Sequence, residues 1–543
     1  MLSSGNLGVG IGLDVLWRLN AAAVNYATTW SFATYAQANN GALPGPWANV
    51  RRTGTATYES SSGVITTLPD LGGGTYAARV QYRSGTARGL LIEGQATQYL
   101  GKSEDFSHVL WTIDGNGTAT PVVTANYGTA PDGTASADRI QLNRSGGSFA
   151  RIRSIAWPAA TATYTVSVWM KNLAAGTANV GLRSGSTGIN CAVTEAWQRF
   201  SLTITGASPD LQILLFSSIA GNDVSADVLA WGAQLEAGAY ATSYVPSTGG
   251  SEVVRAADSA GVFLTSSALS AAFPGGVGQP WTTVFQYRKG YSVSSDETLF
   301  ALSAGSSAGS TNLLALQTNG TQAQAVHSGG SGTLSGTLVH DGSTVNKIAL
   351  SVDPTYRGAE LLTNGDFASG TGWSTGGGVS ISGGKLNFAS VGVGTGAAQT
   401  IAATVGKVYR VTLTVSDWSS GSGVWVQIGT GAAYQFTAAA NGTYSLDVTA
   451  TGTLLQLVSN NASSTFKVDD LSVKEMGAVS VSVNGAAAVE TTGIAFTGSG
   501  TTHLIPGART TGGSTPVLGM EIYDWRNVNT SYTTGASLQA LSA

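Results

Sequence analysis

Charged residues are scarce in this sequence. Only 10% of its 543 residues are Asp, Glu, Lys or Arg, whereas about 25% is usual in soluble domains. With a formal net charge of −4, the chain offers no basic surface to neutralise phosphates, so we expect no nucleic-acid partner. Lys, Glu and Arg also favour helices, and their scarcity argues against long helices.

Cysteine and long apolar runs are also lacking. The single cysteine, Cys191, excludes an intrachain disulfide framework, and we expect it to be a small residue within a strand. The first residues, MLSSGNLGVGIGLDVLWRL, have no basic segment, and charges interrupt their apolar run. We therefore expect no signal peptide, no membrane insertion and synthesis in the cytoplasm.

Apolar residues, glycine and tryptophan are abundant. Hydrophobic residues make up 42% of the chain, which also contains 73 Gly and 13 Trp. A disordered chain would lack this apolar content. Together with many Thr, Ser and Val residues, the composition is typical of short strands joined by turns. It predicts an all-β protein of about three to five domains.

The sequence contains an internal repeat, visible as similar blocks in the same order. Apolar residues alternate with polar ones along the second block of each copy, which is typical of antiparallel strands in a sandwich with one face in the core. Each copy therefore predicts one β-sandwich. The blocks are EDFSHVLW, YTVSVWMK, QRFSLTIT and ADVLAWGAQLEAG in the first copy, and GDFASGTGW, YRVTLTVSDW, YSLDVTAT and FKVDDLSVKEMG in the second.

The second copy interrupts another pattern. KIALSVD places Ile348, Leu350 and Val352 on one face of a strand. The natural partner of this strand is VSVSVNG, which ends in the turn residues Asn484 and Gly485. The second copy lies between these two segments, so we predict that it is inserted into a hairpin loop of a third, host sandwich.

Several phrases resemble bacteriophage tail and virion proteins. RTGTATYESSSGVITT, ARGLLIEGQATQYLGKSEDFSHVLW, TANYGTAPDGTASADRI and AWGAQLEAGAYATSYVPSTG are similar to the lead-in, middle and end of the first sandwich of such proteins. The host sandwich, with GMEIYDWRN and SLQALSA, resembles a laminin-G or concanavalin-like domain. The segment from ELLTNGDFASGTGW to FKVDDLSV is similar to carbohydrate-binding jelly rolls. The resemblance implies a virion-borne, often trimeric fibre, spike or tail component that touches the host surface and leaves the cell by lysis.

Pattern and resemblance together predict a fold of multidomain β-sandwiches, both jelly-roll and concanavalin-like. We expect an arm that attaches to the particle and to other virion proteins and holds a homotrimer together. Two carbohydrate-binding-like jelly rolls and a discontinuous concanavalin-like sandwich follow. The expected boundaries are 1–90 for the arm, 91–250 for the first jelly roll, 258–356 with 477–543 for the host sandwich, and 358–476 for the inserted jelly roll.

Sugar-binding surfaces need flat aromatic faces beside polar groups, because aromatic rings stack on the apolar faces of pyranoses. In the first copy the candidates are Trp169 and Trp197. In the second copy Trp418 and Trp425, with Gln427, flank the SSGSG segment, and a hairpin there would place both rings on one face. The alternative for these tryptophans is packing against a neighbouring module or subunit.

The same resemblance implies one structural calcium ion per jelly roll. Asp366 could converge with Asp469 or Asp470 if the first and last strands of the module lie side by side. Calcium needs six to eight oxygen ligands, so loop carbonyls would supply the rest. The alternative is that these are solvated turn carboxylates, and no other cofactor is expected.

Catalytic motifs are lacking. Glu521 and Asp524 fall on opposite faces of a strand, whereas glycoside hydrolysis needs two opposed carboxylates. The four histidines, His108, His327, His340 and His503, have no metal-ligand spacing. We expect no enzyme. Three hypotheses remain: an adhesin for host polysaccharide, a purely structural virion decoration protein, and a polysaccharide-degrading tail enzyme.

Overall fold

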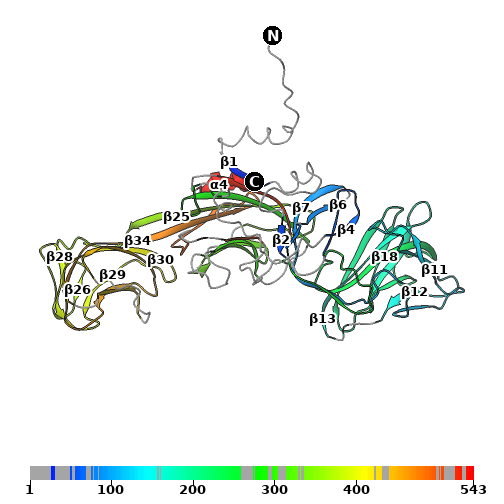
Figure 1. The fold of residues 1–543 in the computed structure, drawn as a ribbon, viewed down its shortest axis with the longest axis horizontal. Helices are drawn as coiled ribbons and strands as arrows, with labels where there is room; N and C mark the ends of the chain where they lie inside the picture. Colours follow the sequence, from blue (N-terminus) through cyan, green and yellow to red (C-terminus); the bar gives the residue numbers. More distant parts are fainter. Residues whose placement is uncertain are drawn as a thin grey trace, which may run out of the picture.

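The computed structural model is built almost entirely of β-strands, as Figure 1 shows, so the prediction of an all-β protein is confirmed. In the described part of the chain the only helix is α4 (Gly535–Ser542). No helix among these residues is long and apolar enough to cross a membrane. The described residues are 26–30, 49–51, 56–68, 75–77, 79–83, 85–155, 158, 160–258, 273, 275–290, 296–303, 313–327, 330–331, 336–420, 423–430, 440–496, 501, 503–506, 520–528 and 533–543.

The first repeat copy, which we call the first module, forms a sandwich of two sheets. Its core contains the alternating residues Tyr164, Val166, Val168 and Met170, all of them buried. In order, one sheet contains β10 (Val122–Gly128), β11 (Ala137–Asn143), β18 (Ser225–Ala237), β13 (Ala162–Asn172) and β16 (Gln198–Gly206). The other contains β15 (Thr187–Val193), β14 (Ala178–Ser184), β17 (Gln212–Phe216), β12 (Phe149–Ser154) and β9 (Trp111–Gly115).

The second copy, the second module, repeats this strand order. Its β27, β28, β34, β30 and β32 correspond in sequence to β10, β11, β18, β13 and β16. The strands of one sheet are β27 (Val379–Ser382), β28 (Lys385–Val391), β34 (Ser464–Val483), β30 (Val408–Ser420) and β32 (Gly442–Thr449). Those of the other are β26 (Ser374–Thr375), β29 (Gly396–Thr400), β33 (Leu454–Ser459) and β31 (Val424–Ile428).

The opening motif of the repeat makes the same tryptophan–phenylalanine contact in both copies. In the first module Trp111 packs on Phe106, with 4.7 Å between ring centroids, and its indole N–H donates to the carbonyl of Lys102. In the second module Trp373 packs on Phe367 at 5.2 Å and donates to the carbonyl of Asn364. The two modules therefore share a topology and this tryptophan contact, a ring packed on Phe with its indole N–H bonded to a backbone carbonyl, which we call the tryptophan lock.

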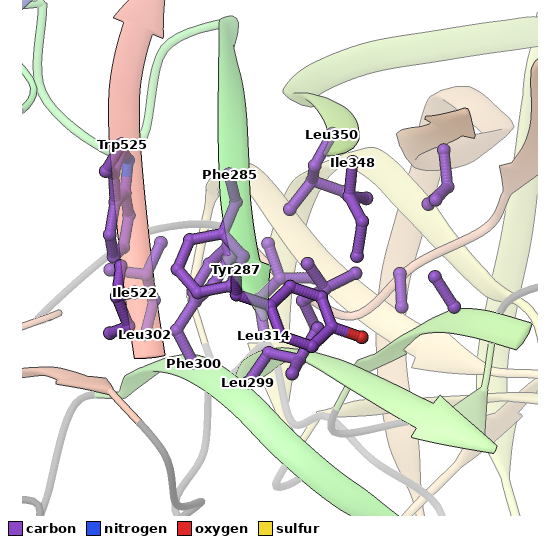
Figure 2. Packing of buried hydrophobic residues seen from close by; sticks show 14 of the residues in the cluster. Phe285, Tyr287, Leu299, Phe300, Leu302, Leu314, Ile348, Leu350, Ile522 and Trp525 are labelled. Carbon is purple, nitrogen blue, oxygen red and sulfur yellow. The ribbon is translucent and has the colours of Figure 1, made fainter. Parts of the chain in front are cut away.

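The host sandwich lies between the modules, and its core contains large aromatic residues. Figure 2 shows Phe285, Tyr287 and Trp525 facing Leu299, Phe300 and Leu302 of the opposite sheet. One sheet contains β35 (Val489–Thr492), β34, β25 (Asn346–Glu360), β20 (Trp281–Lys289), β37 (Met520–Val528), β1 (Tyr26–Trp30), β7 (Thr86–Ile92) and β6 (Val80–Arg83). The other contains β24 (Gly330–Ser331), β23 (Gln322–His327), β22 (Leu314–Asn319), β21 (Glu297–Ser303) and β36 (His503–Pro506).

The expected insertion is present, and its two connecting strands are paired. Ile348 lies opposite Val483, Leu350 opposite Val481, and Val352 opposite Val479. Beyond these pairs β25 and β34 continue together into the second module, where β34 also pairs with β28 and β30. The two strands extend from the centre of the molecule to its left end in Figure 1. The second module is therefore joined to its host by two strands that stay paired across the junction, although their register shifts between Asp353 and Arg357 and again between Arg357 and Glu360.

The expected separate arm over residues 1–90 needs a correction. Val80 and Tyr82 of β6, with Leu90 of β7, are buried in the core of the host sandwich. The sequence did not indicate this because β37, the neighbour of β7 in the sheet, lies more than four hundred positions away. Residues 1–25 lie outside the described residues. Three further pairs are β2 (Asn49–Arg51) with β5 (Thr75–Ala77), β3 (Thr57–Glu59) with β4 (Ile65–Thr67), and β8 (Ala96–Gln98) with β19 (Val253–Arg255).

A buried cluster of four charged residues lies where the first module meets the host. The guanidinium of Arg79 forms ion pairs with Glu93, at 2.6 Å, and with Asp258. Arg255 lies 3.4 Å from Glu93, and Ser243 donates both its N–H and its hydroxyl to the same carboxylate. None of the four charged residues is more than 6% exposed. Two positive and two negative charges balance within the cluster, as buried ions require.

The cluster makes the stability of the chain depend on pH. Burial raises the pKa of Glu93, but Arg255, Arg79 and the hydrogen bonds from Ser243 outweigh burial and lower this pKa from 4.5 to about 2. A lowered folded-state pKa contributes stability that is complete above pH 4.5 and is lost as the pH falls towards 2. We expect the melting temperature of the wild type to fall across this window, and Glu93→Gln to lack that part of the fall.

Thermal denaturation of both proteins at a series of pH values measures the difference. The comparison is between the two slopes of melting temperature against pH. It cancels the opposing contribution of Asp138, whose pKa burial raises to about 6, because both proteins contain this residue. Equal slopes in the two proteins would contradict the assignment.

Candidate functional site

An aromatic cluster covers the outer face of the β13–β18 sheet in the first module. Trp169 and Trp231 lie directly opposite each other on these strands, with 5.5 Å between ring centroids. Tyr244 completes the cluster, 4.6 Å from Trp231 and 5.6 Å from Trp169. The phenol O–H of Tyr244 donates to Glu104. Three rings are thus fixed against one another on a sheet face that would otherwise meet solvent.

A β-bulge in β18 makes room for the cluster. The register of β13 and β18 shifts between Ser167 and Trp169, and Gly232 lies in this shift with a φ of +65°. A Cβ atom on Gly232 would lie 2.9 Å from the ring of Trp169. Glycine is therefore required both by the left-handed backbone and by the close ring.

Arg199 lies over the exposed side of this cluster. It is the cross-strand partner of Trp169 on β16, and its guanidinium carbon is 4.3 Å from the centroid of that ring. The guanidinium donates to the carbonyl of Thr242 at 2.6 Å and to the hydroxyl of Ser167 at 2.9 Å. Burial lowers the pKa of Arg199 to about 10, although Glu236 and Glu93 oppose this shift. The group stays charged at neutral pH.

The cluster forms one wall of a cavity of about 650 Å³, which we call the aromatic cavity. The β3–β4 hairpin supplies the opposite wall, including Tyr58 and Glu59. The hairpin is held to the first module by the hydroxyl of Thr57, which donates to the carbonyl of Tyr244, and by the N–H of Ile65, which donates to the carbonyl of Pro131. The cavity thus lies between two parts of the chain that are far apart in sequence.

Both tryptophans that the sequence singled out in the first copy line this cavity. Trp169 is only 8% exposed, and Arg199 covers its ring. Trp197 is half-buried, and its indole N–H donates to the carbonyl of Thr129 at 3.2 Å. Trp197 therefore presents the larger aromatic surface to the cavity, with the polar side chains of Gln81 and Gln198 beside it.

The second module lacks this cluster. It contains the same bulge in β34, where Asp470 takes the left-handed conformation with a φ of +49°. When the bulges are superposed strand by strand, Thr414 stands where the first module has Trp169, and Asp469 stands where it has Trp231. Thr443 stands in place of Arg199. The two copies share a fold, but the aromatic face belongs to the first.

The prediction of a hairpin around the SSGSG segment is wrong. β30 pairs with β32 and β34, whereas β31 pairs with β33 in the other sheet of the module. Asp417, with a φ of +50°, interrupts the alternation of β30 and turns Trp418 towards the core. Trp418 stacks there on the buried Phe466 at 5.3 Å. It is a packing residue and shares no face with Trp425.

Trp425 and Gln427 lie on β31, on the side opposite Val424 and Val426, which are buried in the core. Gln427 is only 6% exposed, and its amide N–H donates to the side chain of Gln456 on β33. Trp425 is half-buried. These residues do not form an open polar and aromatic surface with Trp418.

The expected calcium ligands each contact another group in the second module, and calcium binding there stays a prediction. The carboxylate of Asp469 lies 3.6 Å from the ammonium of Lys385, and the carboxylate of Asp366 accepts the N–H of Ala368. Asp227 of the first copy binds Arg139 through both oxygens. No group of three or more Asp, Glu, His or Cys residues that could hold a metal ion is found within the described ranges.

The remaining candidates for catalysis do not line the aromatic cavity, or their side chains lie outside the described residues. Glu521 forms an ion pair with Arg88 at 3.1 Å. The side chains of Asp524, His327 and His503 lie outside the described part. His340 is half-buried beside Tyr287, and burial lowers its pKa to about 4.

Sequence reasoning missed the other half of the cavity. Tyr58, Gln81 and Arg83 lie in the segment expected to be an arm, and no local pattern links them to the first module. Arg199 could have been found: in QRFSLTIT it shares the polar face with Ser201 and Thr203, and this face pairs with that of Trp169 once the register of the two strands is known.

Comparison with protein-family models and with curated proteins gives no match. Among solved structures, a tandem CBM22-1–CBM22-2 domain of Paenibacillus barcinonensis Xyn10C aligns over 70% of this chain and 98% of its own, with 12% identity and a TM-score of 0.21. An anti-sigma factor domain-containing protein aligns over 74% of this chain and 97% of its own, with 10% identity and a TM-score of 0.14. TM-scores this low carry no argument about fold or function.

The bulge gives a first test of the cluster. Gly232→Ala places a methyl group against Trp169 in a left-handed backbone, and we expect a loss of about 1–3 kcal/mol in unfolding free energy. The near-ultraviolet circular dichroism of the three stacked rings should change as well. Gly206→Ala is the matched control, because a Cβ atom there meets nothing within 4 Å. Equal effects from the two variants would argue against the role of Gly232.

The packing role of Trp418 is tested in the same way. Trp418→Ala removes the ring that stacks on Phe466, and we expect a loss of about 2 kcal/mol, below that of a fully buried ring. Val393→Ala, in the same module and 59% exposed, should leave stability unchanged. Denaturant titration of the full chain measures both, and an unaffected Trp418→Ala would contradict the packing role.

Proposed function

We propose that this chain is a non-enzymatic virion component, a fibre, spike or tail part, that binds host-surface polysaccharide through the aromatic cavity of its first module. The observation that supports binding is the cavity itself, where Trp197 and Tyr58 lie beside amide and guanidinium groups. Rings of this kind stack on pyranoses, and the polar groups hydrogen-bond the hydroxyls. The assignment to a virion rests on the resemblance of the sequence phrases.

The carboxylates of the cavity support binding over hydrolysis. Glu59 is the only described residue lining the cavity that has a carboxylate. Glycosidases need two carboxyl groups about 5–10 Å apart across the scissile bond. A cavity of this composition can hold a sugar without cleaving it.

Assembly into a homotrimer strengthens weak binding. One shallow site holds a saccharide loosely, but several sites on one particle bind a repetitive polymer with high avidity. We propose that the part of residues 1–90 that precedes β3 carries contacts to the other subunits and to other virion proteins. Size-exclusion chromatography with light scattering tests the trimer, and a monomer would contradict it.

Binding is tested with the full chain on an array of bacterial surface polysaccharides. We expect Trp197→Ala to weaken binding about tenfold, because it removes the larger aromatic surface of the cavity while leaving the core intact. Trp418→Ala is the control, since its ring packs on the second module's core and should leave binding unchanged. A folded chain that binds no polysaccharide would instead favour a structural role in the particle.

A further inference from the structure

A second cavity adjoins the aromatic cavity at the junction of the first module and the host sandwich. It measures about 200 Å³, and we call it the cationic pocket. One wall comes from residues 240–243 of the first module, and the other from Arg288 and Lys289 at the end of β20. Both cavities are lined by Gln81, Arg83, Arg199 and Ser243. The two cavities are therefore neighbours that share these four residues, and we call the two together the groove.

The carboxylates of the cationic pocket are already neutralised by other partners. Glu93 belongs to the buried cluster with Arg79 and Arg255. Glu521 forms its ion pair with Arg88. Lys289 is likewise neutralised, because its ammonium pairs with Glu297. These groups contribute little net charge to the groove.

Three guanidinium groups in the pocket have no carboxylate within ion-pair distance among the described residues: those of Arg83, Arg199 and Arg288. Arg83 is exposed. Arg199 bonds only to a carbonyl and a hydroxyl. Arg288 donates to the carbonyl of Arg88 and lies 4.8 Å above the ring of Tyr523.

The surroundings of these three guanidinium groups disfavour their positive charge unless an anion is bound. Burial and the neighbouring charge of Arg88 lower the pKa of Arg288. Glu236 lies beneath Arg199, but its oxygens accept from Thr242 and Gln234. Burial raises the pKa of Glu236, and the charge of Arg199 opposes this rise. An anion bound in the pocket would meet three donor groups and relieve their mutual repulsion.

We infer that the polysaccharide bound by this chain is acidic, with a sugar ring in the aromatic cavity and its carboxylate or sulfate group in the cationic pocket. This inference rests on the proposed function. Guanidinium groups suit such anions because their planar donors match paired oxygens. The shared residues Arg83 and Arg199 would contact both parts of the ligand.

The test uses the full chain on an array that pairs acidic polymers with neutral ones: polygalacturonate, polysialic acid and chondroitin sulfate beside galactan and dextran. We expect only acidic polymers to bind, and the binding to weaken as salt rises. Chemical reduction of the carboxyl groups of the polymer should abolish binding if a carboxylate is the recognised group. Removal of its sulfate groups should abolish binding if a sulfate is the recognised group.

The variants Arg83→Gln and Arg288→Gln should each weaken acidic binding about tenfold. Arg183→Gln is the matched control for Arg288→Gln, because Arg183 is also half-buried and lies 4.8 Å above an aromatic ring, Phe216, away from the groove. Arg183→Gln should change the affinity for acidic polymers less than twofold, because a charge outside the binding site contributes little.

The outcomes separate the two proposals. Neutral polymers that bind as tightly as acidic ones, with Arg83→Gln and Arg288→Gln unaffected, would overturn the acidic ligand and leave the proposed function standing. A folded wild-type chain that binds no polymer of either kind would overturn both. Acidic binding that is lost only in the two groove variants would support both.

Discussion

The buried ion cluster of Arg79, Glu93, Arg255 and Asp258 is the constraint on which the arrangement of this chain depends. Arg79 precedes a host strand, Glu93 follows the next, and Arg255 and Asp258 lie in the segment that returns from the first module. Each charge was desolvated on folding and is compensated by the other three and by hydrogen bonds such as those from Ser243 to Glu93. The cluster therefore ties the first module to its host beside the groove.

The two modules share a fold but differ in the surface that carries the candidate site. Both copies retain the strand order, the tryptophan lock and the bulge of the closing strand. At the bulge one copy contains glycine, which admits the ring of Trp169, and the other contains Asp470. Where the first copy gathers aromatic residues, the second has Thr414 and Asp469, so a shared backbone carries two different surfaces.

Much of the architecture could be predicted from the sequence, because alternation and the repeat are local signals. They identified the all-β class, the core faces of β13 and β30, and the pairing of KIALSVD with VSVSVNG. The site was harder. A single left-handed residue, Asp417, reversed the face of Trp418, and no period shows such a residue in advance. Tyr58 and Arg83 reach the cavity only through tertiary contacts, to which a one-dimensional pattern is blind.

The shared strands β25 and β34 have a mechanical consequence. A pull on the second module along these strands would load their hydrogen-bonded pairs in shear, so the pairs would resist together. The register shifts on either side of Arg357 interrupt the pairing, so bending between the second module and the host would concentrate there.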